Sequence, residues 1–168
     1  EEKLENCINS DLANNYGNLC QRVISFCEKN MNLQISENIE FNDYDNLELS
    51  SFSKNYLNIS NFIDNQDINS YISFIVDRLF SANKYFNDQE PWKKKNDKVR
   101  LNTIIYTSLE LIRKITILLY PIIPQTSLKV MNMFNYTEKE ITFDSIKNNN
   151  FIKKDIKLTK IGILFKKI

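Results

Sequence analysis

The sequence contains no histidine, and only two glycines and three prolines occur among its 168 residues. Without histidine, a histidine general base and the Ser/His and Cys/His nucleophile arrangements are excluded. Two glycines are too few for a phosphate-binding loop or a dinucleotide-binding fingerprint. We therefore expect no catalytic residues in this chain. The scarcity of turn residues also argues against an all-β fold and favours long helices.

The three cysteines, Cys7, Cys20 and Cys27, form no Cys-x-x-Cys pair, and no histidine could complete a zinc site with them. Cys20 and Cys27 lie seven residues apart in a helical pattern. This spacing suits two small hydrophobic residues that are buried on one face of a helix, in a protein of a reducing compartment. No signal peptide opens the sequence, and the most apolar stretch, Ile115 to Pro124, is too short to span a bilayer. We expect a cytoplasmic or organellar protein with no bound metal and no membrane partner.

The formal net charge of +1 hides an uneven distribution along the chain. Residues 1–90 contain 6 Lys and Arg against 15 Asp and Glu, whereas residues 91–168 contain 16 against 6. Such an asymmetry is compatible with a polyanion that docks on the basic part. The alternative is that the acidic part is only solvated surface, and charge alone favours this alternative.

Apolar periodicity predicts an all-α fold, a bundle of about five helices with a short extended C-terminal segment. Helices are expected over residues 3–29, around residues 52–63, over 69–88, over 97–120 and from Pro124 onward. Residues 30–50 are polar and predict a loop. The helix over 97–120 becomes apolar nearly all round toward its end, so it should be buried centrally.

The last stretch, residues 148–168, alternates in polarity and is rich in β-branched residues. This pattern predicts either a short strand or an extended arm that packs on the bundle. At this length the chain accommodates one full-sized core. We therefore expect a single domain over residues 1–168, with the bundle over about 1–147 and the arm over about 148–168.

Two features stand out on the predicted helices. On the first helix, Asp11, Asn15, Asn18 and Arg22 form a polar stripe about 100° from the apolar one. Trp92, the only tryptophan, follows a proline at a helix break and precedes a run of lysines. Each feature alone has a structural explanation, namely a solvated helix face, a core tryptophan and a charged loop.

Three segments, in the same order, resemble methionyl-tRNA synthetases of the bacterial type. Residues 8–22, INSDLANNYGNLCQR, resemble the opening helix of the anticodon-binding domain. Residues 82–130 contain the family's Ala-Asn-x-Tyr stretch, its Pro-Trp pair and its long helix that ends in Pro-x-x-Pro. The terminal ILFKKI, residues 163–168, is similar to the family's Leu-Phe-Pro-Arg-Ile, with lysines in place of the proline and the arginine. The resemblance covers about half of the chain.

The resemblance implies a helical anticodon-binding domain that reads the CAU anticodon of methionine tRNA. In the family, an asparagine and an arginine one helical turn apart read the anticodon together with the tryptophan of the Pro-Trp pair. Carried over residue by residue, these are Asn18, Arg22 and Trp92. Nearby phosphates would be held by the basic residues Lys93, Lys94, Lys95, Lys98 and Arg100. The expected partners are the anticodon loop of tRNA and a catalytic domain in the same parent chain, and DNA is not expected.

The parent enzyme would charge the tRNA with methionine, using ATP and magnesium. That chemistry belongs to a catalytic domain whose His-Ile-Gly-His and Lys-Met-Ser-Lys-Ser signatures are absent from this sequence. The domain itself should need no cofactor and should be inactive alone. Two alternatives stay open. One is the equivalent domain of a related class I synthetase, and the other is a helical protein-interaction module without a role in nucleic-acid binding.

Overall fold

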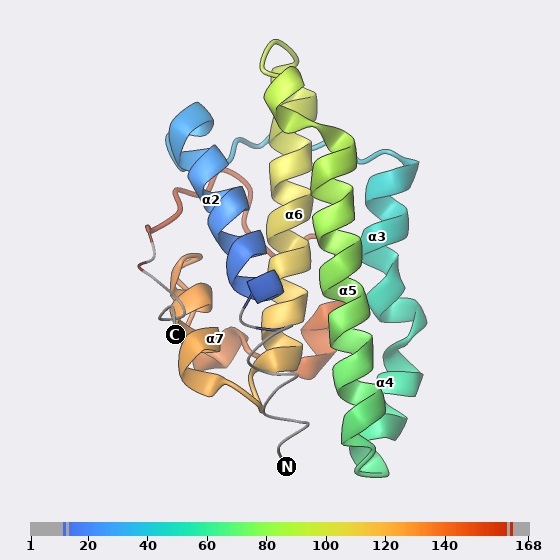
Figure 1. Ribbon diagram of the computed structural model, residues 1–168. Coiled ribbons are helices and arrows are strands. Elements are labelled where there is room, and N and C mark those ends of the chain that lie inside the picture. The colour runs from blue at the N-terminus through green and yellow to red at the C-terminus, as the bar shows by residue number, and fades with distance from the viewer. Residues whose placement is uncertain (1–11, 13, 161, 163–168) are drawn as a thin grey trace.

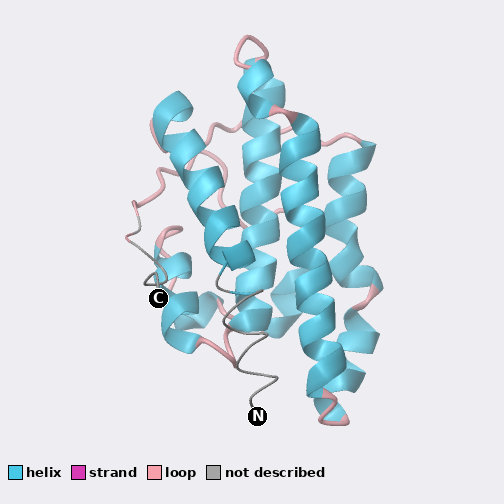
Figure 2. Ribbon diagram, viewed as in Figure 1, coloured by secondary structure: helices cyan, strands magenta, loops and turns pink. Residues whose placement is uncertain are grey.

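Six α-helices make up most of the part of the chain that the computed structural model describes, residues 12, 14–160 and 162. They are α2 (Gly17–Met31), α3 (Asp43–Lys54), α4 (Tyr56–Asp64), α5 (Ile68–Gln89), α6 (Lys98–Leu119) and α7 (Pro124–Asn132). Short 3-10 helices are η2 (Pro91–Lys93), η3 (Glu138–Glu140) and η4 (Phe143–Lys147). Within the described residues Figure 2 shows helices and loops but no strand. The prediction of an all-α bundle is confirmed.

Helix α6 is the centre of the bundle, with α2, α3, α5 and α7 packed around it (Figure 1). Every residue from Leu101 to Leu119 is buried. Such complete burial agrees with the nearly all-round apolar pattern at the end of this helix and confirms its predicted central position.

The ends of the two long helices follow local sequence signals. The side chain of Asp97 accepts a hydrogen bond from the Arg100 amide and caps the N-terminus of α6. Glu90 ends α5 in the left-handed conformation, directly before a proline. In α2, the described helix begins at Gly17 after π-helical residues 14–16, while residues 3–11 and 13 of the predicted first helix lie outside the described part.

The prediction of a loop over residues 30–50 is wrong for its last eight residues, which belong to α3. The helix begins with a capping box in which the Asn42 side chain accepts from the Asp45 amide and the Asp45 carboxylate accepts from the Asn42 amide. Its polar residues mask the helical pattern because two of them, Asp45 and Glu48, are buried with partners from other helices.

Asp45 joins α3, α5 and α6 at one point. Its carboxylate accepts two hydrogen bonds from the Arg100 guanidinium, at 2.6 and 2.9 Å, and one from the Tyr85 hydroxyl. Arg100 also donates to the side-chain oxygen of Gln89 at 2.7 Å. Because Gln89 ends α5 and Arg100 lies in the first turn of α6, this network holds both ends of the turn between the two helices.

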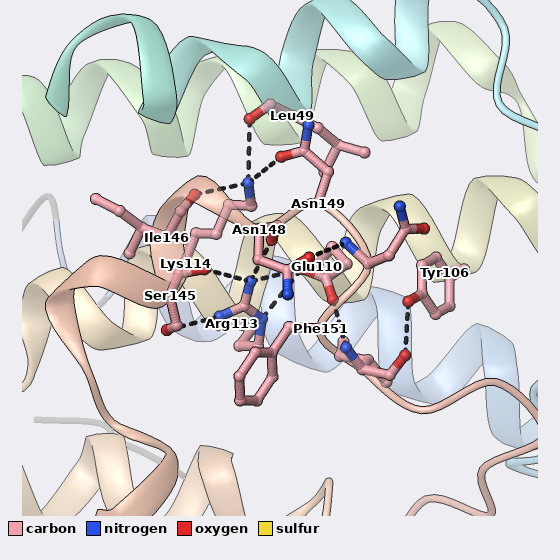
Figure 3. Close-up of polar contacts among 12 residues, drawn as sticks. Leu49, Tyr106, Glu110, Arg113, Lys114, Ser145, Ile146, Asn148, Asn149 and Phe151 are labelled. Carbon is pink, nitrogen blue, oxygen red and sulfur yellow. Dashed lines mark hydrogen bonds and ion pairs between the residues drawn. The ribbon is translucent and has the colours of Figure 1, made fainter.

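Two fully buried residues of α6, Glu110 and Arg113, form an ion pair at 2.8 Å (Figure 3). Arg113 also donates to the backbone carbonyls of Ser145 and Asn148, at 3.1 and 2.8 Å. The second oxygen of the Glu110 carboxylate accepts from the Ile152 amide at 2.7 Å. The charges are thereby paired, as buried charges must be, and they attach the segment after η4 to α6.

The neighbouring Lys114 is also fully buried and extends the same network toward α3 (Figure 3). Its ammonium donates to the carbonyls of Leu49 and Ile146, at 3.1 and 2.8 Å, and to the side-chain oxygen of Asn149 at 2.5 Å. Three donors therefore meet three acceptors. Burial lowers the pKa of Lys114 to about 7.

The segment after residue 148 is extended and packs beside the end of α2. The amide of Ile35 donates to the Ile156 carbonyl and that of Leu158 to the Leu33 carbonyl, both at 2.8 Å. Of the two forms that the sequence left open, the described residues therefore show the arm, with one isolated antiparallel bridge between Gln34 and Lys157. The ILFKKI segment, residues 163–168, lies outside the described residues.

Cys20 and Cys27 are both buried and unpaired, as expected, and Cys7 lies outside the described residues. Burial raises the pKa of each of the two thiols to about 12, which keeps them protonated. None of the described helices is long and apolar enough to cross a membrane. The described residues also contain no cluster of three or more side chains suited to binding a metal ion.

Lys114 should make the stability of the fold depend on pH in a window free of histidine titration. The unfolded chain keeps this lysine protonated up to its ordinary pKa of 10.5, whereas the folded chain releases the proton near 7. Between these values the folded state binds fewer protons, so the free energy of unfolding should rise from pH 7 to about 8.5. Urea unfolding at several pH values measures this slope.

The matched variants are Lys114→Met and, on the exposed surface of α3, Lys54→Met. We expect Lys114→Met to flatten the slope and Lys54→Met to leave it unchanged. A parent protein whose free energy of unfolding is constant over this window would contradict the prediction.

The Asp45–Arg100 pair should contribute strongly to stability. Replacing Arg100 with Met leaves a buried carboxylate without its cation, and such a change costs about 3 kcal/mol of unfolding free energy. Chemical denaturation measures the loss, and Lys98→Met, an exposed cation in the same turn of α6, is the control. Equal midpoints for the two variants would show that the pair contributes little.

Candidate nucleic-acid interface

A hollow of about 330 Å³ lies between α2 and α5 on the surface of the bundle. Its lining residues are Asn15, Asn18, Gln21, Arg22, Phe80 and Asn83. Because Leu19 and Val23 of α2 are turned into the core, the polar residues next to them along the helix face outward. The predicted polar stripe is confirmed for its described members, and it borders this hollow.

Arg22 reaches from α2 across to α5. Its guanidinium lies 5.1 Å from the centre of the Phe86 ring and donates a hydrogen bond to the side-chain oxygen of Asn87. The cation–π contact and the hydrogen bond together fix the direction of the guanidinium plane. Since a guanidinium has five N–H donors, most of them remain for a ligand.

Trp92 lies in η2, after the buried Pro91, and its ring contacts Phe86 edge-to-face with 6.2 Å between centroids. The side chain is 43% exposed. The alternative of a core tryptophan is therefore wrong, and part of the indole is open to a flat ligand. Arg22 lies over the same phenyl ring of Phe86 that Trp92 contacts.

The structure thus brings the three predicted site residues to one region but not into one hollow. Asn18 and Arg22 border the hollow between α2 and α5, whereas Trp92 is not among the residues that line it and packs on Phe86. An exposed ring, a guanidinium and carboxamides are the groups that bind an unstacked nucleobase, the ring by its face and the polar groups by its edge. The role of these residues in reading a base stays a prediction.

The lysines after Trp92 differ in whether their ammonium groups already have a partner in the protein. Lys93 pairs with Glu90 at 3.0 Å, and the ammonium of Lys94 donates to the Gln89 carbonyl. Lys95 and Lys98 are exposed. Pairs of this exposed kind are weak, so the lysines retain most of their charge for a polyanion.

Arg100 requires a correction. The sequence placed it with the lysines as a phosphate contact, but its guanidinium is bonded to Asp45 and Gln89. Breaking these bonds to reach a phosphate would leave the carboxylate buried and unpaired. Arg100 is therefore part of the bundle's framework.

Acidic groups near the interface are also paired. The carboxylate of Asp88, at the end of α5, accepts hydrogen bonds from Lys84 at 2.5 Å and from the Tyr44 hydroxyl at 3.0 Å. The hydrogen bond from Lys84, and to a smaller extent that from Tyr44, lowers the pKa of Asp88. Its negative charge is thus balanced locally rather than directed at an approaching anion.

A second hollow, of about 370 Å³, lies between α4 and α5 and is lined by Phe62, Asn69, Ser70, Ser73, Phe74 and Asp77. Its lining in the described part of the chain includes one carboxylate and no cation. Binding a polyanion there would meet repulsion from Asp77, so the charges favour the hollow between α2 and α5.

Helix α5 contributes residues to the interface that the sequence alone did not indicate. Phe80, Asn83 and Asn87 are spaced by three and four residues, so they share one face of this helix. The signal was present in Phe80, an aromatic residue at an outward position that the core does not need. That this face lies opposite Asn18 and Arg22 follows only from how α2 and α5 pack.

Comparison with known proteins shows the family to which this chain belongs. The family described as the anticodon binding domain of methionyl tRNA ligase matches residues 52–168. The methionine–tRNA ligase of Mycobacterium leprae is 30% identical over 151 residues, which are 87% of this chain and 28% of that protein. The Thermotoga maritima enzyme is 30% identical over 170 residues, covering all of this chain and 27% of that protein. The chain spans about a quarter of the length of these relatives.

Solved structures give the same result. The methionyl-tRNA synthetase of Mycobacterium tuberculosis in complex with methionyl-adenylate superimposes with a TM-score of 0.87 at 26% identity, over 99% of this chain and 33% of that one. Its free form also gives a TM-score of 0.87. The alternatives of another class I synthetase and of an unrelated interaction module therefore do not apply. The chain belongs to the family of methionyl-tRNA ligase anticodon-binding domains.

Proposed function

We propose that this chain binds the anticodon loop of methionine tRNA and selects its CAU anticodon. The observation that carries the proposal is the arrangement around Phe86, whose ring contacts both the exposed indole of Trp92 and the oriented guanidinium of Arg22. Single-stranded RNA loops are recognised by an aromatic ring that stacks on a splayed base and by polar groups that bond its edge.

Selection of cytosine would come from Asn18 and Arg22. Stacking tolerates any base, so the identity of the base must be read by polar groups. Cytosine offers a donor at N4 and acceptors at N3 and O2, which match an asparagine carbonyl and arginine donors respectively. Uracil has the reverse pattern, with an acceptor in place of the N4 donor and a donor in place of the N3 acceptor. It would therefore place donors opposite donors and acceptors opposite acceptors. Among the described residues Asn18 makes no side-chain hydrogen bond, so its carboxamide is available.

Affinity without sequence preference would come from the lysines. Lys93, Lys95 and Lys98 are exposed and Lys94 is partly so, and all four follow Trp92 within six residues in the sequence. Contacts of lysine with phosphate release counterions and make binding dependent on salt. These residues would position the RNA backbone while the base is read elsewhere.

The parent protein would be a methionine–tRNA ligase that charges its tRNA with methionine. ATP and magnesium would be bound by a catalytic region of the same parent chain, and the present chain would act by holding the anticodon end of the tRNA. We place the protein in the cytoplasm or an organelle, where translation takes place.

Replacing Trp92 with Ala tests the stacking role. Removing the indole should weaken binding of a CAU stem-loop by about 1–3 kcal/mol, because one base loses its stacking surface. Fluorescence anisotropy at fixed salt measures the dissociation constant. The control Trp92→Phe keeps an aromatic face and should retain most of the affinity. If Trp92→Ala binds as well as the parent, the proposed reading site is wrong.

The polar pair is tested by comparing CAU with UAU stem-loops. Arg22→Lys keeps the charge but loses the planar set of donors, and Asn18→Ala loses the carboxamide. A matched set of polar contacts favours the correct base by about 1–3 kcal/mol. Each variant should therefore reduce the difference in binding free energy between the CAU and the UAU stem-loops. Asn58→Ala, an exposed asparagine on α4, is the control. Unchanged discrimination in both variants would remove the pair from the site.

A further inference from the structure

Phe80 and Trp92 are the two aromatic side chains that stand out as exposed in the described part of the chain, at 60% and 43%. Both lie beside Arg22. Phe80 lines the same hollow as Arg22, and Trp92 packs against the ring that Arg22 covers. The function proposed above uses Trp92 and leaves Phe80 without a role.

The surroundings of Phe80 are unusual for an exposed phenylalanine. The other described residues that line the hollow are amides and the guanidinium: Asn15, Asn18, Gln21, Arg22 and Asn83. Carboxamides provide both donors and acceptors, which is what the edge of a nucleobase requires. An apolar side chain of a protein partner would instead bury these amides without partners, at a cost in free energy.

Two of the amides are already held in place. Asn83 donates to the Leu79 carbonyl at 3.0 Å, and Gln21 donates to the Ser25 hydroxyl at 3.2 Å. Each bond uses the amide nitrogen and leaves the side-chain oxygen without a hydrogen bond to any described residue. The hollow therefore presents fixed acceptors beside an open ring, a preorganised arrangement that loses little entropy on binding.

We propose that the Phe80 ring, with Gln21 and Asn83 beside it, binds a second unstacked base of the RNA loop, in addition to the base that Trp92, Asn18 and Arg22 read. This inference rests on the function proposed above. The inference is supported by the connection between the hollow and the surroundings of Trp92. The Arg22 guanidinium borders the hollow and also covers the phenyl ring on which Trp92 packs. Phe80 and Trp92 are two exposed rings that are connected through Arg22 and Phe86, so two bases splayed from the same loop could be held on neighbouring parts of one surface.

The test compares three variants of the full 168-residue chain. Phe80→Ala removes the ring, Phe80→Leu keeps an apolar side chain without a π-face, and Phe80→Tyr keeps the ring. We expect Phe80→Ala and Phe80→Leu to weaken binding of the CAU stem-loop about five-fold or more, as the loss of one stacked base does. Phe80→Tyr should stay close to the parent. Equal losses in Phe80→Tyr and Phe80→Ala, or no loss in Phe80→Ala, would overturn the inference.

Stem-loops with an abasic nucleotide at one loop position after another identify the base. On the loop that lacks the base bound by Phe80, Phe80→Ala should cause no further loss. The same loss on every abasic loop would overturn base stacking. A Phe80→Ala variant that changes only self-association, measured by sedimentation, would assign the ring to a protein contact and also overturn the inference.

Trp92→Ala, measured in parallel, separates the two proposals. If Trp92→Ala weakens binding and Phe80→Ala does not, only the second base site fails. If neither variant weakens binding, or if the parent binds none of the loops, both proposals fail.

Discussion

The complete burial of α6 is the constraint on which the rest of the structure depends. A helix covered on all sides cannot turn its charged residues to solvent, so Glu110, Arg113 and Lys114 must find partners inside the protein. They do so with the backbone of residues 145–152 and with the Leu49 carbonyl. The same bonds that satisfy these charges attach the segment after η4 and α3 to the central helix. Figure 3 shows that one polar network serves both purposes.

The candidate interface takes its rigidity from this framework. The turn between α5 and α6 is held at both ends by the network of Asp45, Arg100 and Gln89. Within that turn Pro91 is buried, and the ring of Trp92 rests against Phe86 of α5. A binding ring that is placed by two packed helices loses little freedom when a ligand arrives. The stability of the bundle and the proposed recognition of a base are therefore linked through the same short turn.

The structure shows that only some of the basic residues among residues 91–168 are available to a polyanion. The basic excess of residues 91–168 indicates a surface for a polyanion, yet three of its cations are not available to one. Arg100 is bonded to Asp45, and Arg113 and Lys114 are fully buried. The lysines around Trp92 are the part of the excess that lies next to the exposed indole. Position, and not the count of basic residues, determines where an anion would bind.

The sequence by itself determined the helical class, the positions of α5 and α6 and the shared polar face of Asn18 and Arg22, because periodicity and helix-ending residues are local properties. It did not reveal the first eight residues of α3, which include buried polar residues that have partners in other helices. Tertiary structure alone decided that Arg100 bonds to a residue 55 positions away, that Trp92 is exposed on a phenyl ring and that Phe80 faces Arg22. These contacts join distant segments, and their geometry depends on how whole helices pack against α6.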